Sequence, residues 1–129
     1  MLTIRFNRLG LQPGDLVLDA GAGFGRHAYE IARQGANVVA LDYSAEEMIT
    51  TRGTFGAMVE AGEIPEDRYV ATLQGDATKL PFADGSFDFL CMGFALRHVG
   101  DLRATFAEYR RVLRPGGTLL VLEISRPSS

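Results

Sequence analysis

Three carboxylates, Asp19, Asp42 and Asp76, each stand at the end of a short apolar run of the sequence. Short apolar runs bounded by turn residues are typical of buried strands. An ionised carboxylate accepts several hydrogen bonds at once, so it suits an ammonium group, a ribose diol or an exocyclic amine. If the strands are parallel, their carboxyl ends meet at one edge of the sheet. We therefore expect these three side chains to form one binding site.

The first carboxylate precedes a glycine loop. Glycines occupy positions 21, 23 and 25, and residues 26–34 have a helical pattern. Glycine lets the backbone turn sharply and approach a ligand, and a helix start offers free N–H groups. A dinucleotide fingerprint would place its last glycine where Arg26 stands, and Asp19 suits an ammonium group better than a pyrophosphate. The loop therefore favours S-adenosylmethionine (SAM) over the NAD of an oxidoreductase, and a tight strand–helix turn without a ligand is the alternative.

The other two carboxylates have a binding interpretation and a structural one. Asp42 could accept two hydrogen bonds from a ribose diol, or it could simply flank the start of the next helix. Asp76 follows Gly75, so it could accept from the exocyclic amine of an adenine while the N–H of Ala77 reaches a ring nitrogen. Asp76 could equally be an ordinary turn residue.

Helices and strands alternate along the chain. We expect strands at residues 16–18, 37–41, 69–73, 87–92 and 118–124, and helices at residues 26–34, 44–61 and 101–113. The strands are continuous apolar runs, as expected where helices cover both faces of a parallel sheet. The fold class is therefore α/β, a doubly wound parallel sheet in one domain over residues 1–129. Residues 1–10 could form the end of a further helix.

Composition excludes several classes of function. The chain has 129 residues and a formal net charge of −3 without a basic stripe, so nucleic-acid binding has no electrostatic support. No apolar run approaches the ~20 residues that a membrane span needs, and no signal peptide is evident. Cys91 is the only cysteine, lies within an apolar run and is interpreted as a core residue. We expect a cytoplasmic protein.

Several motifs together resemble class I SAM-dependent methyltransferases, from about residue 9 to residue 126. The matching stretches, in the order of that family, are residues 17–25, 39–42, 75–77, 80–82, 87–88 and 111–117. The resemblance implies SAM as the cofactor and a Rossmann-like sheet with the strand order 3-2-1-4-5. It implies that Gly21 and Gly23 line the methionine end of the cofactor, and that Asp42 with the adjoining Tyr43 holds the ribose. Asp76 with Ala77 would frame the adenine, and Met92 with Gly93 would lie beside the sulfonium.

The second half of the chain is similar to the ubiquinone and menaquinone C-methyltransferases. Residues 93–99, 109–117 and 122–127 carry this resemblance, although that branch typically has Asn where this chain has His98. It implies methyl transfer to a small-molecule acceptor such as a quinol-like ring. Carbon methylation of a quinol requires removal of a phenolic proton, so His98 is the candidate base and Arg97 the candidate partner of a phenolate. The alternative for both is a polar loop without a catalytic part.

The chain is shorter than this family usually is. The resemblance implies two further strands after the fifth and a longer segment before the first, and the sequence contains neither. A SAM-binding core without catalysis, because it lacks a substrate lid, is therefore the alternative function. An uncovered fifth strand would also expose apolar residues along a free edge, which predicts self-association as a homodimer through that strand.

Overall fold

The computed structural model describes residues 12, 14–20, 26–42, 44–65, 67–68, 70–94 and 102–123. Five strands and three helices occupy these residues. In chain order they are β1 (Leu16–Ala20), α1 (Arg26–Arg33), β2 (Asn37–Asp42), α2 (Ala45–Glu60), β3 (Val70–Gln74), β4 (Phe87–Phe94), α3 (Leu102–Val112) and β5 (Leu113–Glu123). The helix end interpreted for residues 1–10 lies outside the described residues.

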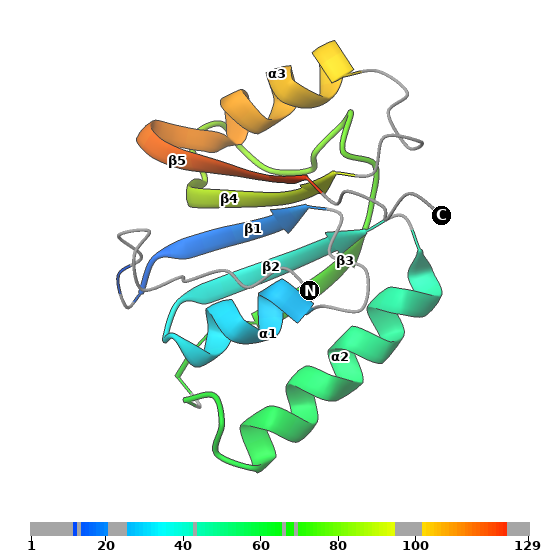
Figure 1. Cartoon of the computed structure of the whole chain (residues 1–129), viewed down its shortest axis with the longest axis vertical. Coiled ribbons are helices and arrows are strands. Elements are labelled where there is room, and N and C mark those ends of the chain that lie inside the picture. Colours follow the sequence, from blue (N-terminus) through cyan, green and yellow to red (C-terminus); the bar gives the residue numbers. More distant parts are fainter. Residues whose placement is uncertain are drawn as a thin grey trace.

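The five strands form one parallel sheet in the order β3-β2-β1-β4-β5. Helices α1 and α2 cover one face, and α3 covers the other, over β4 and β5 (Figure 1). This arrangement confirms the predicted doubly wound α/β fold and its strand order. The order reverses between β1 and β4, which is the point where ligands bind in open sheets of this kind.

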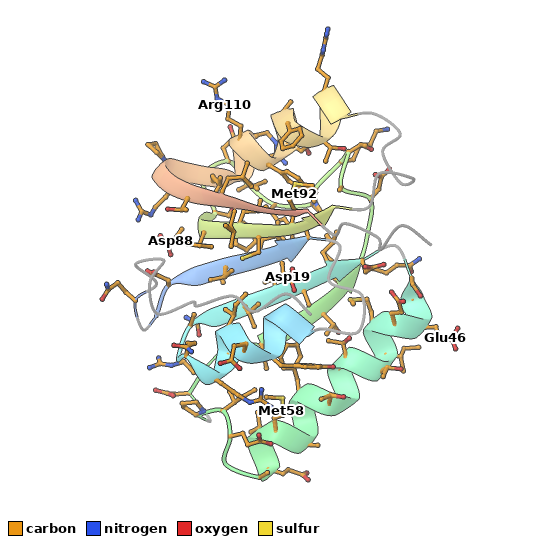
Figure 2. The ribbon with its side chains drawn as sticks, viewed as in Figure 1. Asp19, Glu46, Met58, Asp88, Met92 and Arg110 are labelled. Carbon is orange, nitrogen blue, oxygen red and sulfur yellow. The ribbon has the colours of Figure 1, made fainter. Side chains whose placement is uncertain are left out.

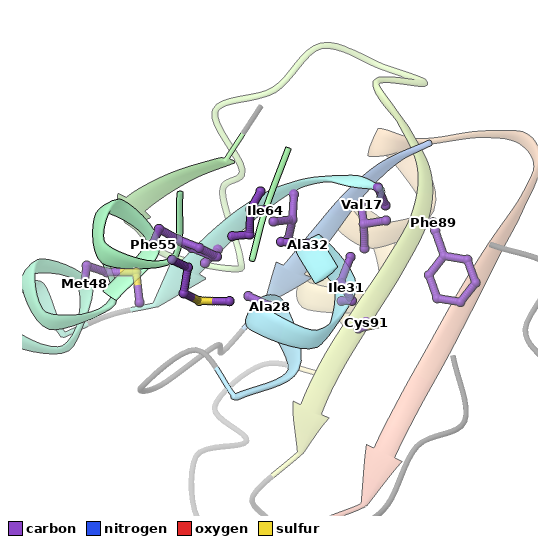
Figure 3. Close-up of a cluster of buried hydrophobic side chains, with 13 residues drawn as sticks. Val17, Ala28, Ile31, Ala32, Met48, Phe55, Ile64, Phe89 and Cys91 are labelled. Atoms are coloured by element: carbon purple, nitrogen blue, oxygen red, sulfur yellow. The ribbon is translucent and has the colours of Figure 1, made fainter. Parts of the chain in front are cut away.

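Each face of the sheet carries its own apolar cluster. On the α1–α2 face, Val17 and Cys91 pack with Ile31 and Phe55, and Cys91 is fully buried as expected of a core residue (Figure 3). On the α3 face, Leu18 packs with residues that include Tyr109. Successive strand residues thus alternate between the two clusters, because side chains of a strand point to opposite faces.

The predicted start of α2 is confirmed by its cap. Ser44 is the N-cap residue, and its hydroxyl oxygen accepts a hydrogen bond from the N–H of Glu47 at 3.1 Å. This bond satisfies one of the helix-start donors that lack an intrahelical partner. The cap matters for the site, because it fixes where the helix begins relative to Asp42 at the end of β2.

The fifth strand begins earlier than predicted. The structure ends α3 at Val112 and pairs Leu113 with Phe87, and pairing then resumes at Thr118 opposite Phe89. Residues 114–117, between these two pairings, form an irregular excursion from the strand. Within it, Gly116 has a φ of 81°, which suits glycine. The glycines and the proline therefore interrupt β5 near its start and do not separate it from α3.

Within the described residues, no helix is long and apolar enough to cross a membrane. The same residues contain no group of three or more His, Cys, Asp or Glu side chains that could hold a metal ion.

Candidate functional site

The strand register brings the predicted site residues to one edge of the sheet. Ala20 pairs with Leu41 on one side and with Met92 on the other, and Asp42 pairs with Gln74. The carboxyl ends of β1 to β4 therefore lie together. Figure 2 shows Asp19 and Met92 on the side of the strand arrowheads, with Asp88 towards the opposite end.

Asp19 is a buried carboxylate beside the start of α1. Its side chain is 1% exposed, and it accepts a hydrogen bond from the N–H of Ala28 in the first turn of the helix. Its Oδ2 has no hydrogen-bond partner among the described residues. Burial raises the pKa of Asp19 to about 7, the Ala28 bond opposes this shift, and the charge of Asp42 adds to it. An unpartnered buried carboxylate oxygen is costly, so this position fits a positively charged donor such as the ammonium group of SAM.

Asp42 ends β2 and organises the start of α2. Its Oδ1 accepts a hydrogen bond from the N–H of Ser44 at 3.1 Å. It therefore flanks the helix start, as the structural interpretation predicted. This bond does not exclude a ribose, because a carboxylate accepts more than one hydrogen bond per oxygen.

Glu47 is a neighbour of this site that the sequence interpretation missed. Its side chain forms a hydrogen bond with that of Asp42, and the pKa of Glu47 is raised by partial burial first and by the charge of Asp42 next. In a capping box, the carboxylate at this position would return to the N-cap N–H. Here that N–H donates to Asp42, and the side chain of Glu47 bonds to Asp42 instead.

Asp76 opens a tight turn after β3. Its Oδ1 accepts from both the N–H and the hydroxyl of Thr78, at 2.8 and 2.7 Å, and its carbonyl accepts from the N–H of Lys79 at 3.0 Å. Asp76 is therefore a turn residue in this structure. The adenine role stays a prediction, and the adjacent Ala77 packs against the apolar cluster beneath α3.

Met92 and Gly93 lie near the end of β4, as the sulfonium prediction requires. The Met92 side chain is 4% exposed within the cluster on the α3 face, so we assign its backbone, and not its thioether, to the edge of the site. Gly93 pairs with Leu122 of β5. Neither observation tests contact with a cofactor.

Some predicted site residues lie outside the described residues. They are Gly21 and Gly23 of the glycine loop, Tyr43, and the candidate catalytic residues Arg97 and His98. Their roles therefore stay predictions.

A pocket of about 440 Å³ lies elsewhere, between α2 and β3, where Phe55 and Val70 contribute to its walls. It contains none of the predicted site residues. We assign the candidate site to the strand ends, because the buried carboxylate of Asp19, with its raised pKa, lies there.

Comparisons with known proteins agree with this geometry. Residues 18–121 match the family of methyltransferase domains. A demethylmenaquinone methyltransferase of Beutenbergia cavernae is 42% identical over 119 residues, which are 92% of this chain and 45% of that relative. A second demethylmenaquinone methyltransferase, from a Mycobacterium species, is 44% identical over 121 residues, which are 94% of this chain and 46% of that relative.

Solved structures share the same sheet. A SAM-dependent methyltransferase from Methanosarcina mazei superposes with a TM-score of 0.77 at 29% identity, covering 94% of this chain and 57% of the other. The chain spans about half the length of the curated relatives that it matches.

Proposed function

Because this chain belongs to the methyltransferase domain family, with SAM as its cofactor, we propose that it transfers a methyl group from SAM to a small-molecule acceptor with a quinol-like ring. The acceptor class rests on the relatives, which are named demethylmenaquinone methyltransferases. The observation that carries the proposal is the buried Asp19, whose Oδ2 lacks a partner at the edge of the sheet where such folds bind ligands.

We assign the ends of the cofactor to successive strand ends. Asp19 binds the ammonium group of the methionine part, next to the glycine loop. The loop after β2 binds the ribose, the turn after β3 binds the adenine, and the end of β4 lies beside the sulfonium. The residues proposed for these contacts are Asp19, Gly21, Gly23, Asp42, Tyr43, Asp76, Ala77, Met92 and Gly93.

SAM supplies an activated methyl group when it is bound, so this chain needs no covalent catalyst. The task of the protein is to hold the two reactants in line, which can lower the activation free energy by about 7–11 kcal/mol. For a ring carbon, a phenolic proton must also be removed. We propose that His98 takes this proton and that Arg97 stabilises the resulting phenolate. After methyl transfer, the methylated ring carbon loses its hydrogen as a proton and the oxygen regains one, which restores the aromatic phenol, and the proton on His98 passes to solvent.

The test compares binding and turnover in one preparation. Calorimetric titration with SAM and with NAD should give binding by SAM alone. An assay with demethylated quinols and small phenols should then show methyl transfer, and Arg97→Ala should lower turnover far more than SAM affinity. Binding without turnover on any acceptor would favour a SAM-binding core, and binding of NAD alone would overturn the cofactor assignment.

Three further predictions, on domain organisation, location and self-association, accompany this proposal. The sequence forms a single domain over residues 1–129, it is cytoplasmic, and it self-associates through β5. The last is supported by the position of β5 at one edge of the described sheet and by Leu119, which is 37% exposed. Light scattering across a concentration series tests it, since a monomer at every concentration would contradict the dimer.

A further inference from the structure

Two residues one helical turn apart on α3 reach across to the segment that joins β3 to β4. Arg111 donates from Nε to Oε2 of Glu108 at 2.7 Å and from Nη2 to Oε1 at 3.1 Å. The same guanidinium donates to the carbonyl of Leu80 at 2.9 Å, to the carbonyl of Phe82 at 2.7 Å, and to Asp84 at 2.9 Å. One side chain therefore binds three residues that lie 27 to 31 positions earlier in the sequence.

Glu108 completes the attachment from the other side. Its Oε1 accepts a hydrogen bond from the N–H of Leu80 at 2.8 Å. The N–H of Leu80 is thus bound by Glu108 and its carbonyl by Arg111. The side chain of Leu80 is buried in the apolar cluster on the α3 face, with 5% exposure. Bidentate arginine–carboxylate pairs have a fixed geometry. The bonds from Arg111 and Leu80 lower the pKa of Glu108, so the pair stays ionised at neutral pH.

Leu80 directly follows the turn that opens at Asp76. At its other end, this turn is bound to β2, because the N–H of Gly75 donates to the carbonyl of Asp42 at 2.9 Å. A turn of four residues is therefore attached to the sheet before it and to α3 after it. Its internal bonds, from Thr78 and Lys79 to Asp76, fix the carboxylate relative to these two attachments.

We propose that Arg111, acting with Glu108, is the positioning residue that holds the Asp76–Ala77 turn for the adenine of the cofactor and thereby sets selectivity for the base. The inference rests on the proposed function. Hydrogen bonds weaken steeply when their geometry is poor, so Asp76 can select an exocyclic amine only while the turn keeps its place. Arg111 acts on the turn through its hydrogen bond to the carbonyl of Leu80.

The experiment measures selectivity and not only affinity. Calorimetry gives the dissociation constants of S-adenosylhomocysteine and of S-inosylhomocysteine, in which a carbonyl oxygen replaces the exocyclic amine. The wild-type protein should prefer the adenine compound by about tenfold or more, as loss of one hydrogen bond to a charged group implies. Arg111→Gln should reduce this preference to about threefold or less, and Arg111→Lys should retain part of it.

Arg114→Gln is the matched control. Arg114 also binds a carboxylate, Asp88, at 2.6 Å, but at the opposite end of β4 from the site. Its replacement should lower stability without changing the ratio of the two dissociation constants. Equal loss of selectivity in Arg111→Gln and Arg114→Gln would overturn the proposal, because it would indicate a general effect of destabilisation.

Amide hydrogen exchange in the ligand-free protein provides a second measurement. Arg111→Gln should accelerate exchange at Thr78, Lys79 and Leu80 by about tenfold or more, and Arg114→Gln should not. If the wild-type protein binds neither nucleoside, the proposed function fails, whereas the exchange data still test the positioning role. If Arg111→Gln does not fold, Glu108→Gln is measured in the same two ways. Unchanged selectivity and unchanged exchange in a folded variant would overturn the inference.

Discussion

The carboxylate of Asp88 accepts a hydrogen bond from the backbone N–H of Leu16 at 2.9 Å, across 72 positions of sequence. Its other oxygen accepts from Nε of Arg114 at 2.6 Å. One side chain at the start of β4 therefore binds the first residue of β1 and a residue of β5. These contacts join the three strands on both sides of the point where the sheet reverses its order.

Removing this carboxylate should weaken the whole sheet. We expect Asp88→Ala to lower the free energy of unfolding at pH 7 by about 1–3 kcal/mol, because the N–H of Leu16 and the guanidinium both lose a partner. Urea denaturation measures the change. Asp67→Ala is the control, since the Asp67 side chain is 76% exposed and lies 4.0 Å from Arg68 in a long ion pair, and it should change stability by less than about 0.5 kcal/mol. Equal effects of the two substitutions would contradict a joining role for Asp88.

The pH dependence of the Asp88 contribution has a defined sign. The hydrogen bond from Leu16 and the bond from Arg114 lower the pKa of Asp88 in the folded protein. The stabilisation is therefore fully present above the unfolded pKa, about 3.9, and is lost as the pH falls through the folded value. The difference in stability between the wild-type protein and Asp88→Ala should accordingly shrink between pH 5 and pH 3. A difference that stayed constant over this range would contradict the assignment.

Asp19 should have the opposite effect on the ligand-free protein. With a pKa of about 7, the folded state keeps a proton that the unfolded chain releases near pH 4. The folded state then binds more protons between these values, so the free energy of unfolding falls as the pH rises from about 4 to about 7. We expect Asp19→Asn to be more stable than the wild-type protein at pH 8, by a few kcal/mol, and similar to it at pH 4.

The same substitution should weaken SAM binding at pH 7. A gain in stability together with a loss of affinity would indicate that Asp19 is retained for the ligand and not for the fold. Thermal unfolding at the two pH values and calorimetry with SAM measure the two effects. If Asp19→Asn were less stable than the wild-type protein at pH 8, Asp19 would act mainly as a structural partner of Ala28.

Asp42 offers the clearest single test of the ribose assignment. We expect Asp42→Ala to weaken SAM binding by about 1.5–3 kcal/mol, through loss of hydrogen bonds to a charged acceptor. Glu46→Ala is the control, because Glu46 is another acidic residue at the start of α2 but lies on its exposed side (Figure 2). Affinity that is unchanged in Asp42→Ala, or reduced equally in both variants, would remove Asp42 from the site.

Much of the fold could be predicted because it depends on local patterns. Apolar runs, the glycine loop and the helical patterns are local signals, and they indicated the elements, the parallel sheet and the edge where the carboxylates meet. The start of β5 was predicted five residues too late, since the pairing of Leu113 with Phe87 depends on a partner strand that the local sequence does not reveal.

The contacts that organise the site were harder to predict for the same reason. The bond between Glu47 and Asp42 stands in place of the return bond of a capping box, and the hydrogen bonds from Arg111 to Leu80 and Phe82 are to backbone carbonyls, which carry no residue-type signal. In the sequence, Arg111 is only part of a family motif. Its role follows from the packing of α3 against the segment before β4.

The last prediction concerns the excursion within β5. A Cβ added to Gly117 would lie 2.9 Å from the carbonyl oxygen of Arg114 and 3.0 Å from that of Asp88. Both are backbone atoms, so neither can move aside as a flexible side chain would. Gly117→Ala should therefore force a backbone shift and lower the free energy of unfolding by about 1–3 kcal/mol.

Gly53→Ala is the matched control, with an effect of opposite sign. Gly53 lies within α2, and an added Cβ there has no neighbour within 4 Å. Alanine favours a helix over glycine by about 1 kcal/mol, so this variant should be more stable than the wild-type protein. Urea denaturation of the two variants under one set of conditions gives the comparison. If Gly117→Ala were as stable as the wild-type protein, the backbone around Gly117 could shift without a cost in free energy. The close approach of Gly117 to the carbonyl of Asp88 would then not contribute to stability.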